Sequence, residues 1–125
     1  MVLKKTTEDF LEAILVLRQQ HGFARSVDVA QRLGVSKPAV STTLKVLIEA
    51  GYVEKAPAAP FGLSLTDAGR EVAEQTYARH CFFRDWLIWA GIDPRTADRE
   101  ACELEHAISP ESFRTLRKAV EARAI

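Results

Sequence analysis

Apolar and polar residues follow a helical period along most of the chain. Apolar side chains recur three and four positions apart within residues 10–17, 27–50 and 113–120. This spacing is typical of amphipathic helices that bury one face. Thr6 or Thr7 can cap the first helix, which we expect to end near Gln20. The pattern predicts a mainly α-helical chain.

Residues 27–50 predict two short helices joined by a tight turn at residues 33–35. We expect Ser26 to cap the first of these helices. Ser36 can cap the second helix, and Pro38 suits its first turn because a proline there removes no intrahelical hydrogen bond. The two segments together are typical of a helix-turn-helix.

The second helix of this pair is expected to have two different faces. The face that packs on a core carries the apolar residues Val40, Leu44, Leu47 and Ile48. The opposite face is small, polar and cationic, and hydroxyls and amines on such a face can reach base edges and phosphates in a major groove. We therefore predict a DNA-contacting surface made of Ser36, Lys37, Pro38, Ala39, Ser41, Thr42 and Lys45.

A short β-hairpin is predicted directly after these helices. Residues 52–55 and 63–65 have the composition of strands, and the proline-rich segment 56–62 has that of a turn. Thr66 can then cap a new helix. Two ordinary core helices would explain the helical period, but the hairpin favours a winged helix-turn-helix with a two-stranded wing.

Three further helices are predicted, over residues 67–90, 94–108 and from 110 onward. Gly91 can end the first of them, and a proline opens each of the other two. We expect a DNA-binding domain over residues 1–70 and a helical dimerisation domain over residues 71–125.

Four of the ten aromatic residues lie within eight positions of the long helix: Phe82, Phe83, Trp86 and Trp89. The 35 residues that follow this helix are too few to bury the whole aromatic cluster, so we predict a homodimer interface here. The alternative is a winged-helix regulator without a working metal site, in which Trp86 and Trp89 bind an organic effector.

Charge is balanced, with 17 Lys and Arg against 17 Asp and Glu. A nucleic-acid binder is usually basic, so tight DNA binding by this chain calls for help from a bound cation or from dimer avidity. An apolar run of eighteen residues is absent, as is a cleavable signal, so we expect a cytoplasmic protein without membrane contact. The two cysteines are too few for a disulfide framework and are expected to stay reduced.

Cys102, Glu105 and His106 offer a thiol, a carboxylate and an imidazole at positions i, i+3 and i+4 of one predicted helix. Such donors can hold a divalent transition metal once another segment completes the shell, and the candidates for that role are His80, Asp9 and Glu12. Each residue also has an ordinary explanation, such as a cysteine acting as a small hydrophobe or acids in a first turn complementing the helix dipole. A metal-dependent hydrolase with Glu105 or Glu12 as base is a third possibility, but the chain has neither a nucleophile motif nor a Gly-rich phosphate loop, so we expect no enzyme.

Several segments in order resemble the diphtheria-toxin-repressor family of metal-dependent transcriptional repressors. They are TTEDFLEAIL, SKPAVSTTLKVL, LTDAGREVA, ARHCFFRDWLIWAGI and EACELEHAIS, and the resemblance covers nearly all of residues 6–123. It implies a homodimer whose winged helices read a palindromic double-stranded operator, and whose helical domain holds Fe(II) or Mn(II). It also implies a short, two-domain member like the manganese-transport-regulator branch.

The resemblance assigns ligands residue by residue. Asp9, Glu12 and His80 match ligands of the manganese branch, and Glu105 with His106 match a pair shared across the family. Cys102 instead matches the iron-responsive branch, where a cysteine stands in EAC-x-x-EH, as it does here.

The metal preference and the number of ions follow from this mixture of branches. In the iron branch a Glu four residues beyond the His completes an ancillary site, and here that position is Arg84, a cation that repels a second metal. A thiolate also bridges two hard ions less readily than a carboxylate does. We therefore expect one ion per subunit, which joins the first helix to the Cys102 segment and so orients the DNA-reading helices.

Overall fold

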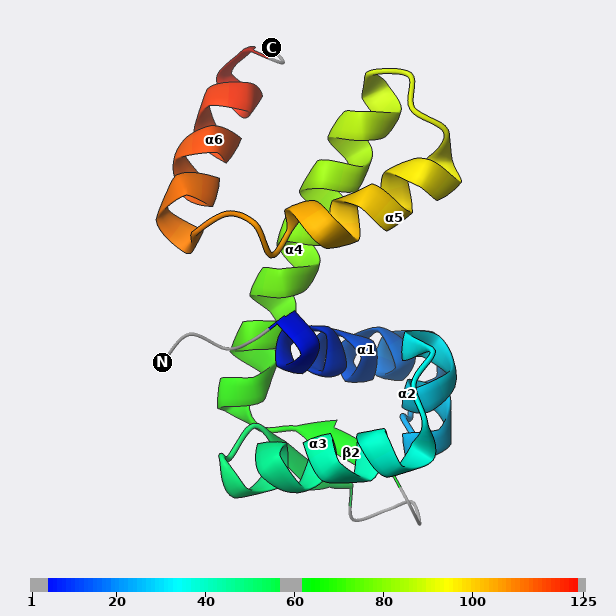
Figure 1. Ribbon diagram of the computed structural model, residues 1–125. Helices are drawn as coiled ribbons and strands as arrows, with labels where there is room; N and C mark the ends of the chain where they lie inside the picture. The colour runs from blue at the N-terminus through cyan, green and yellow to red at the C-terminus, as the bar shows by residue number, and fades with distance from the viewer. Residues whose placement is uncertain (1–4, 57–61, 124–125) are drawn as a thin grey trace. The chain divides into compact units, whose positions relative to one another are not determined.

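The computed structural model describes residues 5–56 and 62–123, and within them six helices and a two-stranded sheet are present (Figure 1). The chain divides into two compact units, Met1–Gln75 and Thr76–Ile125. The long helix α4, Asp67–Trp89, contributes to both units. In the described residues, no helix is both long enough and apolar enough to cross a membrane.

The first unit contains α1 (Lys5–His21), α2 (Ser26–Leu33), α3 (Lys37–Glu49), β1 (Val53–Lys55) and β2 (Leu63–Leu65). Helix α1 supplies much of the core, because its apolar stripe is buried from Phe10 to Leu17 as the helical period predicts. Val40 and Leu47 of α3 are also buried, but Ile48 is 37% exposed, so its predicted core position is wrong.

The turn between α2 and α3 has the predicted geometry. Gly34 adopts a left-handed conformation with φ of 67°, which ends α2. The Ser36 hydroxyl then accepts a hydrogen bond of 3.2 Å from the Ala39 amide and caps α3. The cap predicted for α2 is wrong by one position, because Arg25 occupies the N-cap and Ser26 already lies in the helix. Arg25 instead pairs with the Asp28 carboxylate at 2.9 Å, which ties the start of α2 to its own first turn.

The wing is an antiparallel pair in which Val53 lies opposite Leu65 and Lys55 opposite Leu63. Much of the predicted turn between the strands, residues 57–61, lies outside the described residues. Thr66 caps α4 as predicted, since its hydroxyl accepts a hydrogen bond of 3.1 Å from the Gly69 amide. A side chain at Gly69 would overlap the carbonyl oxygen of Tyr52, so only glycine lets α4 start this close to the wing.

The second unit contains the end of α4, α5 (Pro94–Leu104) and α6 (Pro110–Arg123). Its core is formed by Phe83, Ala101 and Phe113, and the Phe82 ring meets the Phe113 ring edge-on at 5.4 Å between centroids. Helix α5 therefore packs on α4 through apolar contacts that do not depend on the polar groups nearby. The predicted end of α5 near Ile108 is wrong, because the helix ends at Leu104.

Candidate metal centre

Three of the predicted ligands come together at the end of α5. Cys102 lies on the last turn of the helix, Glu105 is its C-cap, and His106 lies in the turn that follows. One ligand atom from each of the three lies within 4.8 Å of the others. The expectation that one helix face presents them holds for Cys102 and Glu105, because the Glu105 backbone is helical and its amide donates to the Ala101 carbonyl at 2.9 Å, whereas His106 lies in the turn beyond. The tight turn after Leu104 nevertheless keeps the three side chains together.

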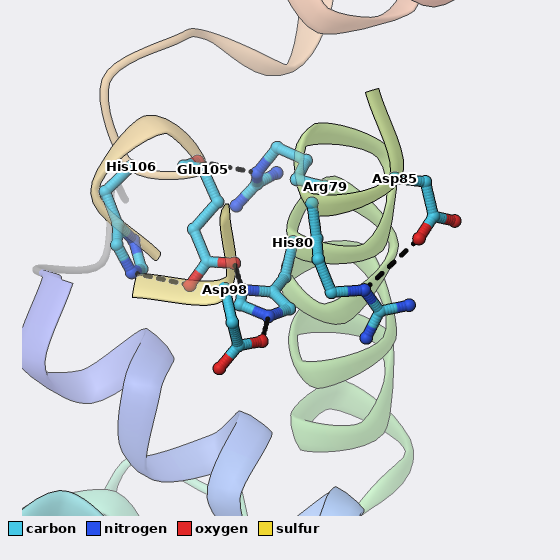
Figure 2. A network of polar contacts seen from close by, with 7 residues as sticks. Arg79, His80, Asp85, Asp98, Glu105 and His106 are labelled. Carbon is cyan, nitrogen blue, oxygen red and sulfur yellow. Dashed lines mark hydrogen bonds and ion pairs between the residues drawn. The ribbon is translucent and has the colours of Figure 1, made fainter. Parts of the chain in front are cut away.

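His80 reaches the same place from α4. Its Nδ1 lies 3.2 Å from Glu105 Oε2, and its Nε2 lies 2.8 Å from Asp98 Oδ1 (Figure 2). Because a carboxylate only accepts hydrogen bonds, the Nε2–H donates to Asp98, and Nδ1 is left facing Glu105. Asp98 thus sets the orientation of the imidazole. Asp98 was not among the predicted site residues, although its position four residues before Cys102 places both on one face of α5.

Glu105 is the centre of this group and is fully buried. Its Oε1 lies 3.1 Å from His106 Nε2, so each carboxylate oxygen faces a different imidazole. Burial alone raises the pKa of the Glu105 carboxyl, but the hydrogen bonds and charges of His106 and His80 outweigh it, and the net pKa is lowered. Glu105 is therefore an anion at neutral pH.

These residues fit a divalent transition metal by the chemistry of their donors. Imidazole nitrogen, carboxylate oxygen and thiol sulfur are the mixed set that borderline ions such as Fe(II), Co(II) and Zn(II) accept. His80 Nδ1 and Glu105 Oε2 lie 3.2 Å apart, and when the imidazole is deprotonated at Nδ1 both atoms offer lone pairs that attract a cation. Cys102, which is half-buried, adds the soft donor.

The other predicted site residues lie in the first unit. Asp9 and Glu12 are half-buried on α1, and their part in metal binding stays a prediction. All seven residues of the predicted DNA-contacting surface are exposed, on α3 or at its cap. The Thr42 hydroxyl donates to the Pro38 carbonyl at 3.0 Å, so it presents its methyl group and its lone pairs outward.

One further polar contact involves Glu105. The Arg79 Nε–H donates to the main-chain carbonyl of Glu105 at 2.9 Å, and Arg79 is only 6% exposed (Figure 2). Sequence patterns give no signal for this contact, because it depends on a backbone atom of a residue 26 positions away.

Comparison with known families accounts for both units. A family model for the N-terminal DNA-binding domain of iron-dependent repressors matches residues 2–59, and one for their metal-binding and dimerisation domain matches residues 66–123. The chain belongs to the iron-dependent repressor family. Its winged helix and its helical domain are therefore those of a metal-dependent transcriptional regulator, as the resemblance implied.

Individual relatives agree with this assignment. The transcriptional regulator MntR of Escherichia coli is 36% identical over 91% of this chain and 72% of its own length. The metal-dependent transcriptional regulator MtsR matches 92% of this chain and 53% of its own with a TM-score of 0.81 and 30% identity. The IdeR of T. acidophilum matches all of this chain and 55% of its own with a TM-score of 0.79 and 25% identity. The chain thus spans about half the length of these two solved structures.

Proposed function

We propose that this protein is a metal-activated transcriptional repressor that binds a palindromic operator as a homodimer and responds to Fe(II) or Mn(II). The observation that carries the proposal is the convergence of Cys102, Glu105 and His106 at the end of α5. Glu105 is a buried anionic carboxylate beside two imidazoles and a thiol. Burying a carboxylate without a cation destabilises a helical core, so this arrangement favours a metal-binding role.

In this proposal the ion is bound by Cys102, Glu105 and His106, with His80 beside them as a further candidate ligand. Asp9 and Glu12 of α1 complete the shell, as the resemblance implies. A bound divalent ion supplies positive charge that holds these donors together, and so couples the domain that reads DNA to the domain that dimerises. The thiol favours Fe(II), Co(II) or Zn(II), whereas the α1 carboxylates favour Mn(II). One ion per subunit is expected.

The DNA-reading part of the proposal rests on α3. One face of α3 is exposed and carries the hydroxyls of Ser41 and Thr42 and the cations Lys37 and Lys45. In a dimer, two such helices held about 34 Å apart would enter successive major grooves on one side of the duplex. Fixing that spacing through the metal raises affinity without a basic surface, which suits a chain of zero net charge.

The homodimer is supported by apolar side chains that the second unit leaves exposed. Trp89 is 82% exposed and Trp86 38%, and both lie near the end of α4. Phe82 and Phe83 are covered in part by Phe113 of α6, so only the tryptophan end of the aromatic cluster is left for a partner subunit. The family match to a metal-binding domain disfavours the organic-effector alternative.

The same proposal places the protein in the cytoplasm, where the operator is, and assigns it no enzymatic activity, since its relatives are transcriptional regulators. The test is DNA binding with and without metal. A palindromic duplex selected from a random library in the presence of Mn(II) is labelled, and its affinity is measured by fluorescence anisotropy with Mn(II), with Fe(II) under anaerobic conditions, and with a chelator. We expect metal to tighten binding at least tenfold. Equal affinity in the chelator would refute metal activation.

A further inference from the structure

Arg79 is a buried cation that donates a hydrogen bond to the main chain of a metal-ligand candidate. Its Nε–H donates to the Glu105 carbonyl at 2.9 Å, and only 6% of the residue is exposed to solvent. Arginine is rarely buried unless its donors are used, because removing a guanidinium from water is costly. The geometry points to a positioning role: we infer that Arg79 fixes the Glu105–His106 turn in the shape that binds metal. This inference rests on the proposed metal site.

The carbonyl that Arg79 holds is one that α5 cannot satisfy itself. The last carbonyls of an α-helix have no intrahelical donor, and Glu105 is the C-cap of α5. A guanidinium at this end also complements the negative end of the helix dipole. Arg79 therefore satisfies a carbonyl at the end of α5, where no glycine or proline follows directly.

The same carbonyl controls the direction of the next ligand. The peptide plane that contains the Glu105 carbonyl also contains the amide nitrogen of His106, and this plane is rigid. Holding the oxygen with a hydrogen bond therefore sets the orientation from which the His106 side chain departs. That side chain meets Glu105 Oε1 at 3.1 Å, so both ligands depend on one turn of backbone.

Neighbouring residues of α4 hold Glu105 at two points. Arg79 donates to its main-chain carbonyl, and His80 faces its carboxylate Oε2 at 3.2 Å (Figure 2). The apolar contacts of Phe83 with Ala101 and Phe113 pack the helices separately from this clamp. Loss of Arg79 should therefore loosen the ligands while the core remains packed.

Charge alone predicts the opposite effect, and this makes the inference testable. A fixed cation near a metal site repels the metal, so if Arg79 acted only through its charge, its removal would tighten metal binding. If Arg79 positions the turn, its removal weakens binding, by about 10–100-fold as for other residues that orient metal ligands. The matched control is Arg84, on the same helix, which pairs with Asp85 at 3.2 Å.

The experiment uses Co(II) as the probe on the full chain. Competition with a chromophoric chelator gives the Co(II) affinity of the parent, Arg79→Gln, Arg79→Lys and Arg84→Gln, and absorption spectra at saturating Co(II) report the thiolate charge-transfer and d–d bands. We expect Arg79→Gln to bind about 10–100-fold more weakly with altered d–d bands. Arg79→Lys, which keeps a cation and a donor, should fall between Arg79→Gln and the parent. Arg84→Gln should match the parent in the affinity of the first ion, because Arg84 opposes only a second ion.

Unchanged or tighter binding by Arg79→Gln would overturn the inference, and so would an equal loss in Arg84→Gln. Circular dichroism checks that each variant folds. If Arg79→Gln does not fold, the test passes to Arg79→Lys, and an affinity equal to that of the parent in this variant overturns the inference. A parent that shows no Co(II)–thiolate band contradicts the proposed metal site itself. A parent with that band and an unaffected Arg79→Gln contradicts only the role of Arg79.

Discussion

Glu105→Gln separates the metal-binding role of Glu105 from its role in the fold. The substitution keeps the size of the side chain but removes the charge and replaces one acceptor oxygen with an NH₂ donor. The parent carboxylate has two charge-assisted contacts, at 3.1 Å to His106 and 3.2 Å to His80. When these imidazole nitrogens carry protons, each contact contributes about 1.5–3 kcal/mol, so at most about 3–6 kcal/mol is at stake. Removing the charge also removes the cost of burying it, which is of similar size.

The two effects largely cancel in the metal-free protein, so we expect its free energy of unfolding to change by less than about 2 kcal/mol. Metal binding has no such compensation, because the ion loses its fully buried anionic ligand. We expect the affinity for Co(II) to fall at least about 100-fold, which corresponds to about 2.8 kcal/mol. Urea unfolding in a chelator measures the first quantity, and chelator competition measures the second. Parental Co(II) affinity in a folded Glu105→Gln protein would refute the ligand assignment.

Three other predictions concern the DNA-contacting surface, the dimer and one ion pair. Lys45→Ala should weaken binding to all duplexes and reduce the slope of log K against log salt concentration by about one. Thr42→Ala should mainly change base preference. Fluorescence anisotropy on selected and scrambled duplexes checks both. Trp89→Glu places a charge on the 82% exposed side chain and should give a monomer by light scattering at micromolar concentration, so a persistent dimer would place the interface elsewhere. The hydrogen bond from Arg25 lowers the pKa of Asp28 below 3.8, so the stabilisation from this pair is present above that pH and is lost as the pH falls through the lowered value. Arg25→Ala should return the pKa of Asp28 to its ordinary value in an NMR titration.

Features set by local chemistry could be predicted from the sequence. Ser36, Thr66 and Asp93 cap their helices as hydroxyl and carboxylate side chains do, because the partner amide lies three residues away in the chain. The wing could be predicted for a similar reason, since its strands are separated by a proline-rich segment. Family resemblance then assigned the candidate ligands, because the order of the matching segments along the chain is specific.

Features set by tertiary contacts could not be predicted in this way. Helix α5 has no glycine or proline at its end, and its last carbonyl is bound by Arg79 from another helix, so the sequence pattern continued to Ile108 while the helix ended at Leu104. Asp98 was missed because its role depends on His80, 18 residues earlier. The convergence of Cys102 with Glu105 was predicted from their helical spacing, whereas His106 reaches them from the turn beyond the end of the helix.

The central claim is that an ion held at the end of α5 switches DNA binding, and Cys102→Ala tests it most directly. Cys102 is half-buried and its ligand atom lies within 4.8 Å of those of Glu105 and His106, so removing the thiol should disturb the site without unfolding the protein. Operator affinity is measured by anisotropy for the parent and for Cys102→Ala, each in a chelator and at increasing Fe(II) or Mn(II). The account predicts that metal tightens binding by the parent and has little effect on Cys102→Ala at the same concentrations, with equal affinities in the chelator. Undiminished metal activation in Cys102→Ala would contradict it.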